Sequence, residues 1–408
     1  ALLSSEGEFV EIVELIAGGP AESSGQLKAG DRIVGVGQAS DDIQDVVGWR
    51  LADVVDLIRG PKGSEVHLRI RPGTRGSDSR ERVITLTRNT IELEEQAARA
   101  EVREVERDNG LQRIGVIEVP AFYADFGAAN AGDEDYRSTT RDVRELLASE
   151  TLADIDGLVI DLRGNAGGSL EEAVRMTGLF INQGPVVQVH RSNGRREVLT
   201  DPAGEPAVYD GPLGVMVDGR SASASEIFAA AMQDYGRGVV MGDQTFGKGT
   251  VQTLVGLERF GVGDDQTPSG RLKLTIAKFY RINGESTQLE GVTPDLEMPF
   301  PHASDGMGER AADNALPWDT IRSADYDRLS ELDGMVSTLR RHHQRRLRLD
   351  PALQAVAKEA SRLESEREKT TVSLNEAERR AEIDAAEAAR LDAVNAQLTA
   401  YGREPLES

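Results

Sequence analysis

The first 90 residues alternate between short apolar runs and glycine-rich turns. Apolar and polar positions alternate with a period of two, which predicts strands, and one stretch has the three-and-four spacing of an amphipathic helix. The sequence therefore predicts a small β-rich module. The predicted strands are 8–15, 29–37, 66–70 and 81–88, and the predicted helix is 50–60.

From residue 91 the pattern changes to longer alternation of strands and helices. A buried strand at 113–119 is followed by a helix at 137–150, and two strand-loop-helix units follow at 155–181 and 211–236. We expect both loops to lie at the same edge of a sheet, where α/β folds place their sites.

The last stretch, 301–408, is rich in Glu, Arg and Ala with helical spacing. It predicts a helical C-terminal extension without a catalytic role. The fold class is therefore α+β and multidomain, with expected domains at 1–90, 91–300 and 301–408.

The composition and charge of the chain argue against several classes of function. The chain has 408 residues, a net charge of −23, no cysteine and five histidines. The acidic excess argues against nucleic-acid binding, and the lack of cysteine excludes disulfides and thiolate chemistry. No run approaches the roughly 20 apolar residues of a membrane span. We expect no cofactor. Because the chain begins with Ala1, we expect it to be a piece of a longer protein.

Three serines, Ser221, Ser223 and Ser225, stand at alternate positions before the alanine-rich helix. Ser223 and Glu226 fit an S-x-x-E capping box, so helix capping explains part of the pattern. A catalytic role needs a base. None of the histidines has a suitable setting, whereas Lys248 in "TFGKGTVQ" lies between glycines that permit close backbone approach. In the following strand Gln252 falls on the same face as Lys248, where its amide can hold the amine.

Several segments of the sequence together resemble a known family. "SASASEIFAAAMQDYG", "TFGKGTVQ", "DLRGNAGG" and "GVTPD" resemble the tail-specific, C-terminal processing serine peptidases with a Ser-Lys dyad. "AGDRIVGVG" resembles a PDZ domain, and "DNALPWD" with the helices after it resembles the C-terminal extension of the Gram-negative Prc (Tsp) subgroup. The resemblance implies a PDZ-like module, a peptidase core with a crotonase/ClpP-like α/β spiral, and a helical extension.

The resemblance also implies residue roles, and only through it can the three serines be told apart. Ser223 is the implied nucleophile, Lys248 the base and Gln252 the residue that orients the lysine. The implied oxyanion hole consists of the peptide N–H groups of Ala224 and Gly168. Asp234 matches a carboxylate that the subgroup needs, but because it lies about three helical turns after Ser223, we expect it to support the fold and not to transfer protons. The PDZ carboxylate-binding loop is expected just before Leu2 and Leu3, which are assigned to substrate binding.

The implied partners are proteins with apolar C-termini and a helical-repeat lipoprotein adaptor, and the implied location is the periplasm. Two rival hypotheses remain at this stage. A crotonase-type acyl-CoA enzyme would share the spiral and the oxyanion amides but would not need Ser223 and Lys248. A PDZ scaffold with an inactive peptidase-like domain would bind tails without cutting.

Overall fold

The computed structural model describes two compact units, Ala1–Ala97 and Ala98–Ser408, which are treated separately below. The expected boundaries near residues 90 and 300 lie outside the described residues. The described ranges are 1–15, 19–39, 42–73, 80–89, 97–107, 110–132, 136–257, 270–299, 308–367, 369 and 371–406.

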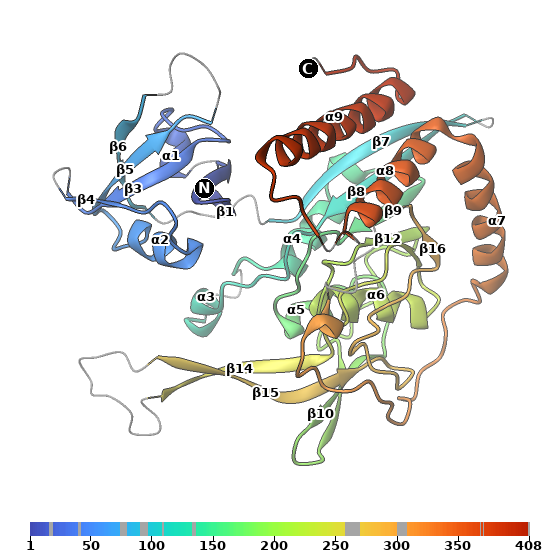
Figure 1. Cartoon of the computed structure of the whole chain (residues 1–408). Coiled ribbons are helices and arrows are strands. Elements are labelled where there is room, and N and C mark those ends of the chain that lie inside the picture. The colour runs from blue at the N-terminus through green and yellow to red at the C-terminus, as the bar shows by residue number, and fades with distance from the viewer. Residues whose placement is uncertain are drawn as a thin grey trace. The chain divides into compact units, whose positions relative to one another are not determined.

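The described residues of the first unit form a six-stranded antiparallel sheet and two helices (Figure 1). Its strand order is β1-β2-β3-β5-β6, with β4 paired to β3, so β1 and β6 are the edges. Buried Val10, Ile33 and Ile70 contribute to its hydrophobic core. The predicted β-rich module is confirmed. The elements are β1 (Leu2–Glu6), β2 (Phe9–Glu14), α1 (Pro20–Ser23), β3 (Arg32–Gly37), β4 (Ile43–Asp45), α2 (Leu51–Ile58), β5 (Glu65–Arg71) and β6 (Arg82–Thr87).

The second unit is built on a mostly parallel sheet of order β16-β13-β12-β9-β8-β7. Only the pairing of β7 with β8 is antiparallel. The inner strands β9 and β12 are nearly continuous runs of apolar residues, as expected for strands covered on both faces. The strands are β7 (Arg99–Arg107), β8 (Gly110–Glu118), β9 (Gly157–Asp161), β12 (Leu213–Val217), β13 (Val239–Gly242) and β16 (Leu296–Glu297).

Helices α5 (Leu170–Gly178) and α6 (Ala224–Asp234) follow β9 and β12, and they pack against each other. Phe180 and Phe228 meet edge to face at 5.6 Å between ring centroids. Because β9 and β12 are parallel neighbours, the loops that leave their carboxyl ends lie at one edge of the sheet. This confirms the expectation drawn from the two strand-loop-helix units. Two further helices are α3 (Phe126–Asn130) and α4 (Thr139–Leu147).

A second, antiparallel sheet has the order β11-β10-β15-β14. Strand β14 forms one of its edges, and Lys248 lies two residues before this strand begins. In Figure 1, β14 and β15 run side by side away from α6. The strands are β10 (Pro185–Arg191), β11 (Arg196–Thr200), β14 (Thr250–Gly256) and β15 (Arg271–Tyr280).

The predicted helical extension is confirmed, and its described residues contain three long helices: α7 (Asp333–Leu349), α8 (Pro351–Arg367) and α9 (Glu376–Ala400). The segment before them is tied to the sheet domain, since Leu329 N donates to Tyr235 O at 2.8 Å and Trp318 Nε1 to Ser286 O at 2.9 Å. None of the helices in the described part of the chain has the length and apolarity needed to cross a membrane.

Candidate active site

Ser223 occupies an unusual backbone conformation at the start of α6. It has φ 57° and ψ −109°, and it is one of three non-glycine residues with positive φ in the described chain. Such a conformation is strained for a residue with a Cβ and persists only where the surrounding structure enforces it. Ser223 is also partly exposed, whereas Ser221 and Ser225 are fully buried.

The two flanking serines are hydrogen-bonded to the neighbouring loop. Ser221 Oγ donates to Leu162 O at 2.8 Å, and Ser225 Oγ donates to Asn165 O at 2.9 Å. Both hydroxyls therefore hold the β9–α5 loop against the start of α6. Of the three serines, Ser223 is the one whose side chain a substrate can reach.

Glu226 connects the serine to the lysine segment. Its carboxylate is fully buried and accepts hydrogen bonds from the peptide N–H of Ser223 (2.6 Å), of Lys248 (3.0 Å) and of Gly247 (2.7 Å), and from Thr245 Oγ1 (2.7 Å). Burial raises the pKa of Glu226 to about 7, and these hydrogen bonds oppose the rise. The bond to Ser223 N is the Glu arm of the predicted capping box, and the same carboxylate also fixes the lysine loop.

Lys248 is half-buried in a tightly packed loop. An added Cβ at Gly247 would lie 2.7 Å from Leu289 O, and one at Gly249 would lie 2.7 Å from Gln288 N. Gly247 also has φ +91°. The flanking glycines therefore permit the close backbone approach expected from the sequence.

Gln252 lies in β14, and its contact with Lys248 stays a prediction. Its side chain is exposed, and among the described residues no hydrogen bond joins it to the Lys248 amine. The register of β14 on β15 shifts between Val251 and Gln252, and the extra residue, Ile276, belongs to β15.

The β9–α5 loop, which contains Gly168, lies against Ser223. Gly167 N donates to Asn165 Oδ1 at 2.8 Å, while neither Gly168 N nor Ala224 N has a hydrogen-bond partner among the described residues. An added Cβ at Gly167 would lie 2.9 Å from Ser223 Cβ and 3.1 Å from Ala224 N. The start of α6 and the β9–α5 loop, which meet at Ser223, thus each carry one unpaired peptide N–H group. An oxyanion hole needs two such donors.

Asp234 lies at the far end of α6 from Ser223. Its side chain is 5% exposed and forms an ion pair with Arg281, whose side chain is 12% exposed. Burial raises the pKa of Asp234, and the Arg281 guanidinium opposes that effect. The pair joins α6 to the turn after β15, a contact that supports the fold.

Leu2 and Leu3 lie in β1, an edge strand of the first unit. Leu2 is 53% exposed, whereas Leu3 packs against the hydrophobic core. Helix α2 contacts β1. The open side of β1 can therefore pair with an added strand next to α2.

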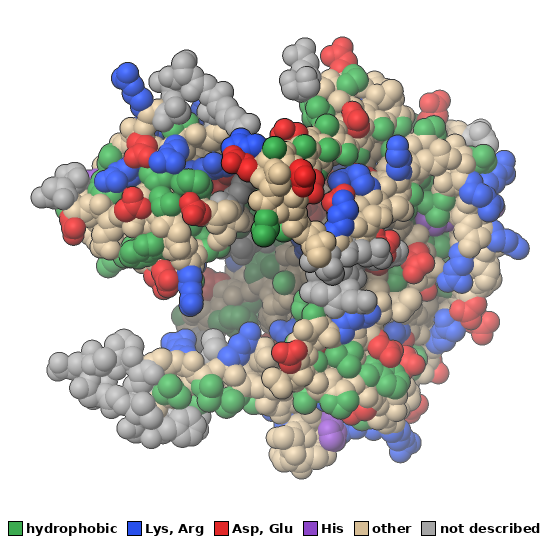
Figure 2. Space-filling model, viewed as in Figure 1, with side chains coloured by type: hydrophobic (Ala, Val, Ile, Leu, Met, Phe, Trp, Pro, Cys, Tyr) green, Lys and Arg blue, Asp and Glu red, His purple; other side chains and the backbone are tan. Residues whose placement is uncertain are grey.

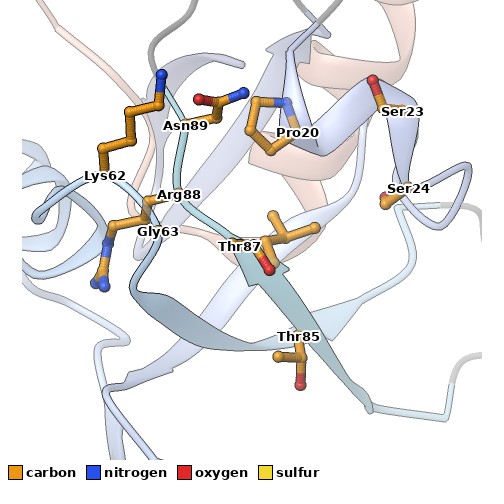
Figure 3. A pocket seen from close by; sticks show the side chains of 10 residues that line it. Pro20, Ser23, Ser24, Lys62, Gly63, Thr85, Thr87, Arg88 and Asn89 are labelled. Carbon is orange, nitrogen blue, oxygen red and sulfur yellow. The ribbon is translucent and has the colours of Figure 1, made fainter.

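A pocket of about 450 Å³ opens at the other edge of this sheet, beside α1 and β6 (Figure 3). Most of the residues that line it are of polar type, among them Ser23, Lys62, Thr85 and Thr87, and Pro20 also lines it. Since β1 and β6 are opposite edges of the sheet, the pocket is separate from the strand assigned to peptide binding. The described residues contain no group of three or more His, Cys, Asp or Glu side chains that could hold a metal ion.

Three residues that organise the site were missed from the sequence: Glu226, Thr245 and Asn165. Glu226 was read only as part of a helix cap. Thr245 and Asn165 stand in the same segments as Lys248 and Gly168, but short polar residues in loops carry no signal of burial.

Comparison with known proteins agrees with this geometry. The PDZ domain model matches residues 3–71, the model of peptidase family S41 matches residues 113–298, and that of the C-terminal domain of tail specific protease matches residues 303–408. The chain belongs to peptidase family S41, in the group with a PDZ domain and a tail-specific protease C-terminal domain.

Individual relatives are named as tail-specific or carboxy-terminal processing proteases. The tail-specific protease of Haemophilus influenzae is 43% identical over 99% of this chain, which spans 56% of that protein. The carboxy-terminal processing protease CtpA of Bacillus subtilis is 32% identical over 72% of this chain and 54% of its own length. The PDZ domain of a Vibrio cholerae carboxy-terminal protease, solved in complex with peptide, is 52% identical over 23% of this chain and 93% of that domain, with a TM-score of 0.22.

Proposed function

We propose that the protein is a serine endopeptidase in which Ser223 is the nucleophile and Lys248 the general base. The observation that carries the proposal is the buried Glu226 carboxylate, which accepts the peptide N–H groups of both residues. A carboxylate shared in this way holds the two segments in one fixed arrangement, which catalysis by a nucleophile and its base requires.

The proposed reaction is acyl transfer to serine. The neutral Lys248 amine takes the proton of Ser223 Oγ as that oxygen attacks the peptide carbonyl. The N–H groups of Ala224 and Gly168 stabilise the negative charge that develops on the carbonyl oxygen. The lysine ammonium then protonates the leaving amine, and a water molecule hydrolyses the acyl-enzyme. Gln252 is proposed to orient Lys248 when substrate is bound.

The first unit is proposed to select the substrate. An apolar C-terminus would add as a strand beside β1, with one side chain toward α2. The relation to a PDZ domain solved in complex with peptide supports this role. Such a tether raises the local concentration of the rest of the substrate near Ser223. A periplasmic location and a helical-repeat lipoprotein adaptor are proposed from the family resemblance alone.

The experiment is cleavage of an unfolded polypeptide that ends in apolar residues. The wild-type protein should cut it, the Lys248→Ala variant should not, and a version ending in aspartates should be cut more slowly. Equal cleavage by the variant would exclude Lys248 as the base, and no cleavage by the wild type would favour the inactive scaffold.

A further inference from the structure

The chain on both sides of Lys248 is held by a second group of hydrogen bonds, apart from those to the buried carboxylate described above. Leu289 N donates to Gly247 O at 2.8 Å, and Gly249 N donates to the side-chain oxygen of Gln288 at 2.9 Å. Gln288 and Leu289 are adjacent residues of one turn. The peptide unit that carries Lys248 therefore lies between two hydrogen bonds from the same turn.

Gln288 is fully buried, and both ends of its side-chain amide are hydrogen-bonded. Its Oε1 accepts Gly249 N, and its Nε2 donates to Glu309 Oε1 at 3.1 Å. An ionised carboxylate only accepts hydrogen bonds, so Glu309 selects the orientation in which the amide NH₂ lies toward it. The amide oxygen then faces Gly249 N. A reversed amide would lose both bonds and leave buried polar groups unpaired, which is costly.

Glu309 comes from the C-terminal domain of the tail-specific protease group and not from the stretch matched by the peptidase family. It begins a short 3₁₀ helix. Its own N–H donates to Phe246 O at 3.0 Å, and Arg310 Nη2 donates to Leu289 O at 3.2 Å. The same short segment of the C-terminal domain thus contacts the lysine loop and the turn that supports it.

The charge of Glu309 does not by itself indicate a function. The chain has 70 Asp and Glu residues, and acidic side chains are scattered over the surface visible in Figure 2. Glu376, for example, pairs with Arg380 of the same helix, and both side chains are exposed. Such pairs contribute little. Glu309 differs because it is half-buried and accepts a hydrogen bond from a fully buried amide next to the lysine loop.

We propose that Glu309, acting through Gln288, positions the main chain of Lys248 for catalysis, so that the C-terminal domain completes the peptidase site. Glu309 contacts no reacting atom, which makes it a positioning residue. The proposal rests on the proposed roles of Ser223 and Lys248, and adds to them a residue from another domain. A misplacement of about 1 Å between reacting groups lowers the rate by about 10²-fold, so the loss of this support should appear in turnover.

The first test compares three variants of the full chain on one peptide substrate. Glu309→Ala leaves Gln288 Nε2 without its acceptor, and we expect kcat to fall by about tenfold with a smaller change in KM. Glu309→Gln keeps a side-chain oxygen that can accept the same bond, so it should retain most of the wild-type kcat. Ser330→Ala is the control, because it removes a hydrogen bond from Ser330 Oγ to Gly236 O elsewhere in the same domain. It should match the wild type.

Three results of this comparison would overturn the proposal. They are a wild-type kcat in Glu309→Ala, no recovery of kcat in Glu309→Gln, and a loss in Ser330→Ala as large as that in Glu309→Ala. The last result would show that any loosening of the C-terminal domain has the same effect. Absence of cleavage by the wild type would instead count against the peptidase function.

An exchange of the two side chains gives an independent test. Gln288→Glu still accepts Gly249 N but sets two carboxylates against each other, so its kcat should fall. The double variant Gln288→Glu/Glu309→Gln restores one donor and one acceptor in exchanged positions, and it should recover part of the lost kcat. A double variant with no higher kcat than Gln288→Glu would contradict the proposal. If thermal unfolding shows that Gln288→Glu does not fold, the comparison of Glu309→Ala with Glu309→Gln decides.

Discussion

The carboxylate of Glu226 accepts the peptide N–H of Ser223 at 2.6 Å. Ser223 is the N-cap residue of α6, and Glu226 lies in the first turn of the same helix. The bond holds Ser223 in its strained conformation, and the same oxygen accepts Lys248 N. We therefore propose that Glu226 is a positioning residue, which acts through the backbone of the proposed nucleophile and the proposed base.

Replacing Glu226 should affect turnover more than binding. Glu226→Gln puts an amide where four donors converge, so at least one of their hydrogen bonds is lost. We expect kcat to fall by about 10²-fold with a smaller change in KM, since a misplacement of about 1 Å has this effect on a reacting pair. Thr245→Val, which removes one donor, should have a smaller effect of the same kind. A Glu226→Gln variant that is fully folded and fully active would contradict the positioning role.

The raised pKa of Glu226 predicts how stability varies with pH. The carboxyl group has a pKa of about 7 in the folded protein and an ordinary value of 4.5. The folded state therefore binds the proton more tightly, so the contribution of Glu226 to stability is full below pH 4.5 and is lost as pH rises through 7. The free energy of unfolding, measured in urea at several pH values, should show this decline in the wild type and a weaker one in Glu226→Gln. Identical pH dependence in both proteins would show that Glu226 does not titrate in this range.

Gly168 cannot carry a side chain without moving the β9–α5 loop. Its φ is +145°, and an added Cβ would lie 2.1 Å from Phe122 O. Gly168→Ala should lower kcat by about 10² to 10³, the usual effect of losing one oxyanion donor. Gly157→Ala in β9 is the matched control, because the nearest atom to its added Cβ is 3.6 Å away. Equal kcat in the two variants would remove Gly168 from the proposed oxyanion hole.

Asp234 should matter for folding and not for proton transfer. Asp234→Asn leaves Arg281 buried without a countercharge, which typically costs about 3 to 5 kcal/mol of unfolding free energy. The double variant Asp234→Leu/Arg281→Met should regain much of that loss. Urea unfolding measures both effects. An Asp234→Asn protein with unchanged stability but no turnover would instead assign Asp234 to the chemistry.

The sequence predicted much of this organisation because its signals are local. The periodicity identified strands and helices such as β9, α6 and α8, and the order of the two strand-loop-helix units placed their loops at one sheet edge. The register of β14 on β15 could not be predicted from local sequence patterns, because the shift next to Gln252 depends on the partner strand. The role of Glu226 could not be predicted for a related reason. An S-x-x-E pattern is also typical of an ordinary helix cap, and only burial against the Lys248 loop distinguishes a carboxylate that holds both segments from one that only caps α6.

The central claim is that Ser223 is a nucleophile activated by Lys248, and a covalent label tests it most directly. The protein is treated with a serine-reactive fluorophosphonate and the modified residue is located by peptide mass spectrometry. The account predicts a label on Ser223, none on the buried Ser221 and Ser225, and a large loss of labelling in Lys248→Ala. Labelling of Ser221 or Ser225 in place of Ser223, or undiminished labelling in Lys248→Ala, would contradict it.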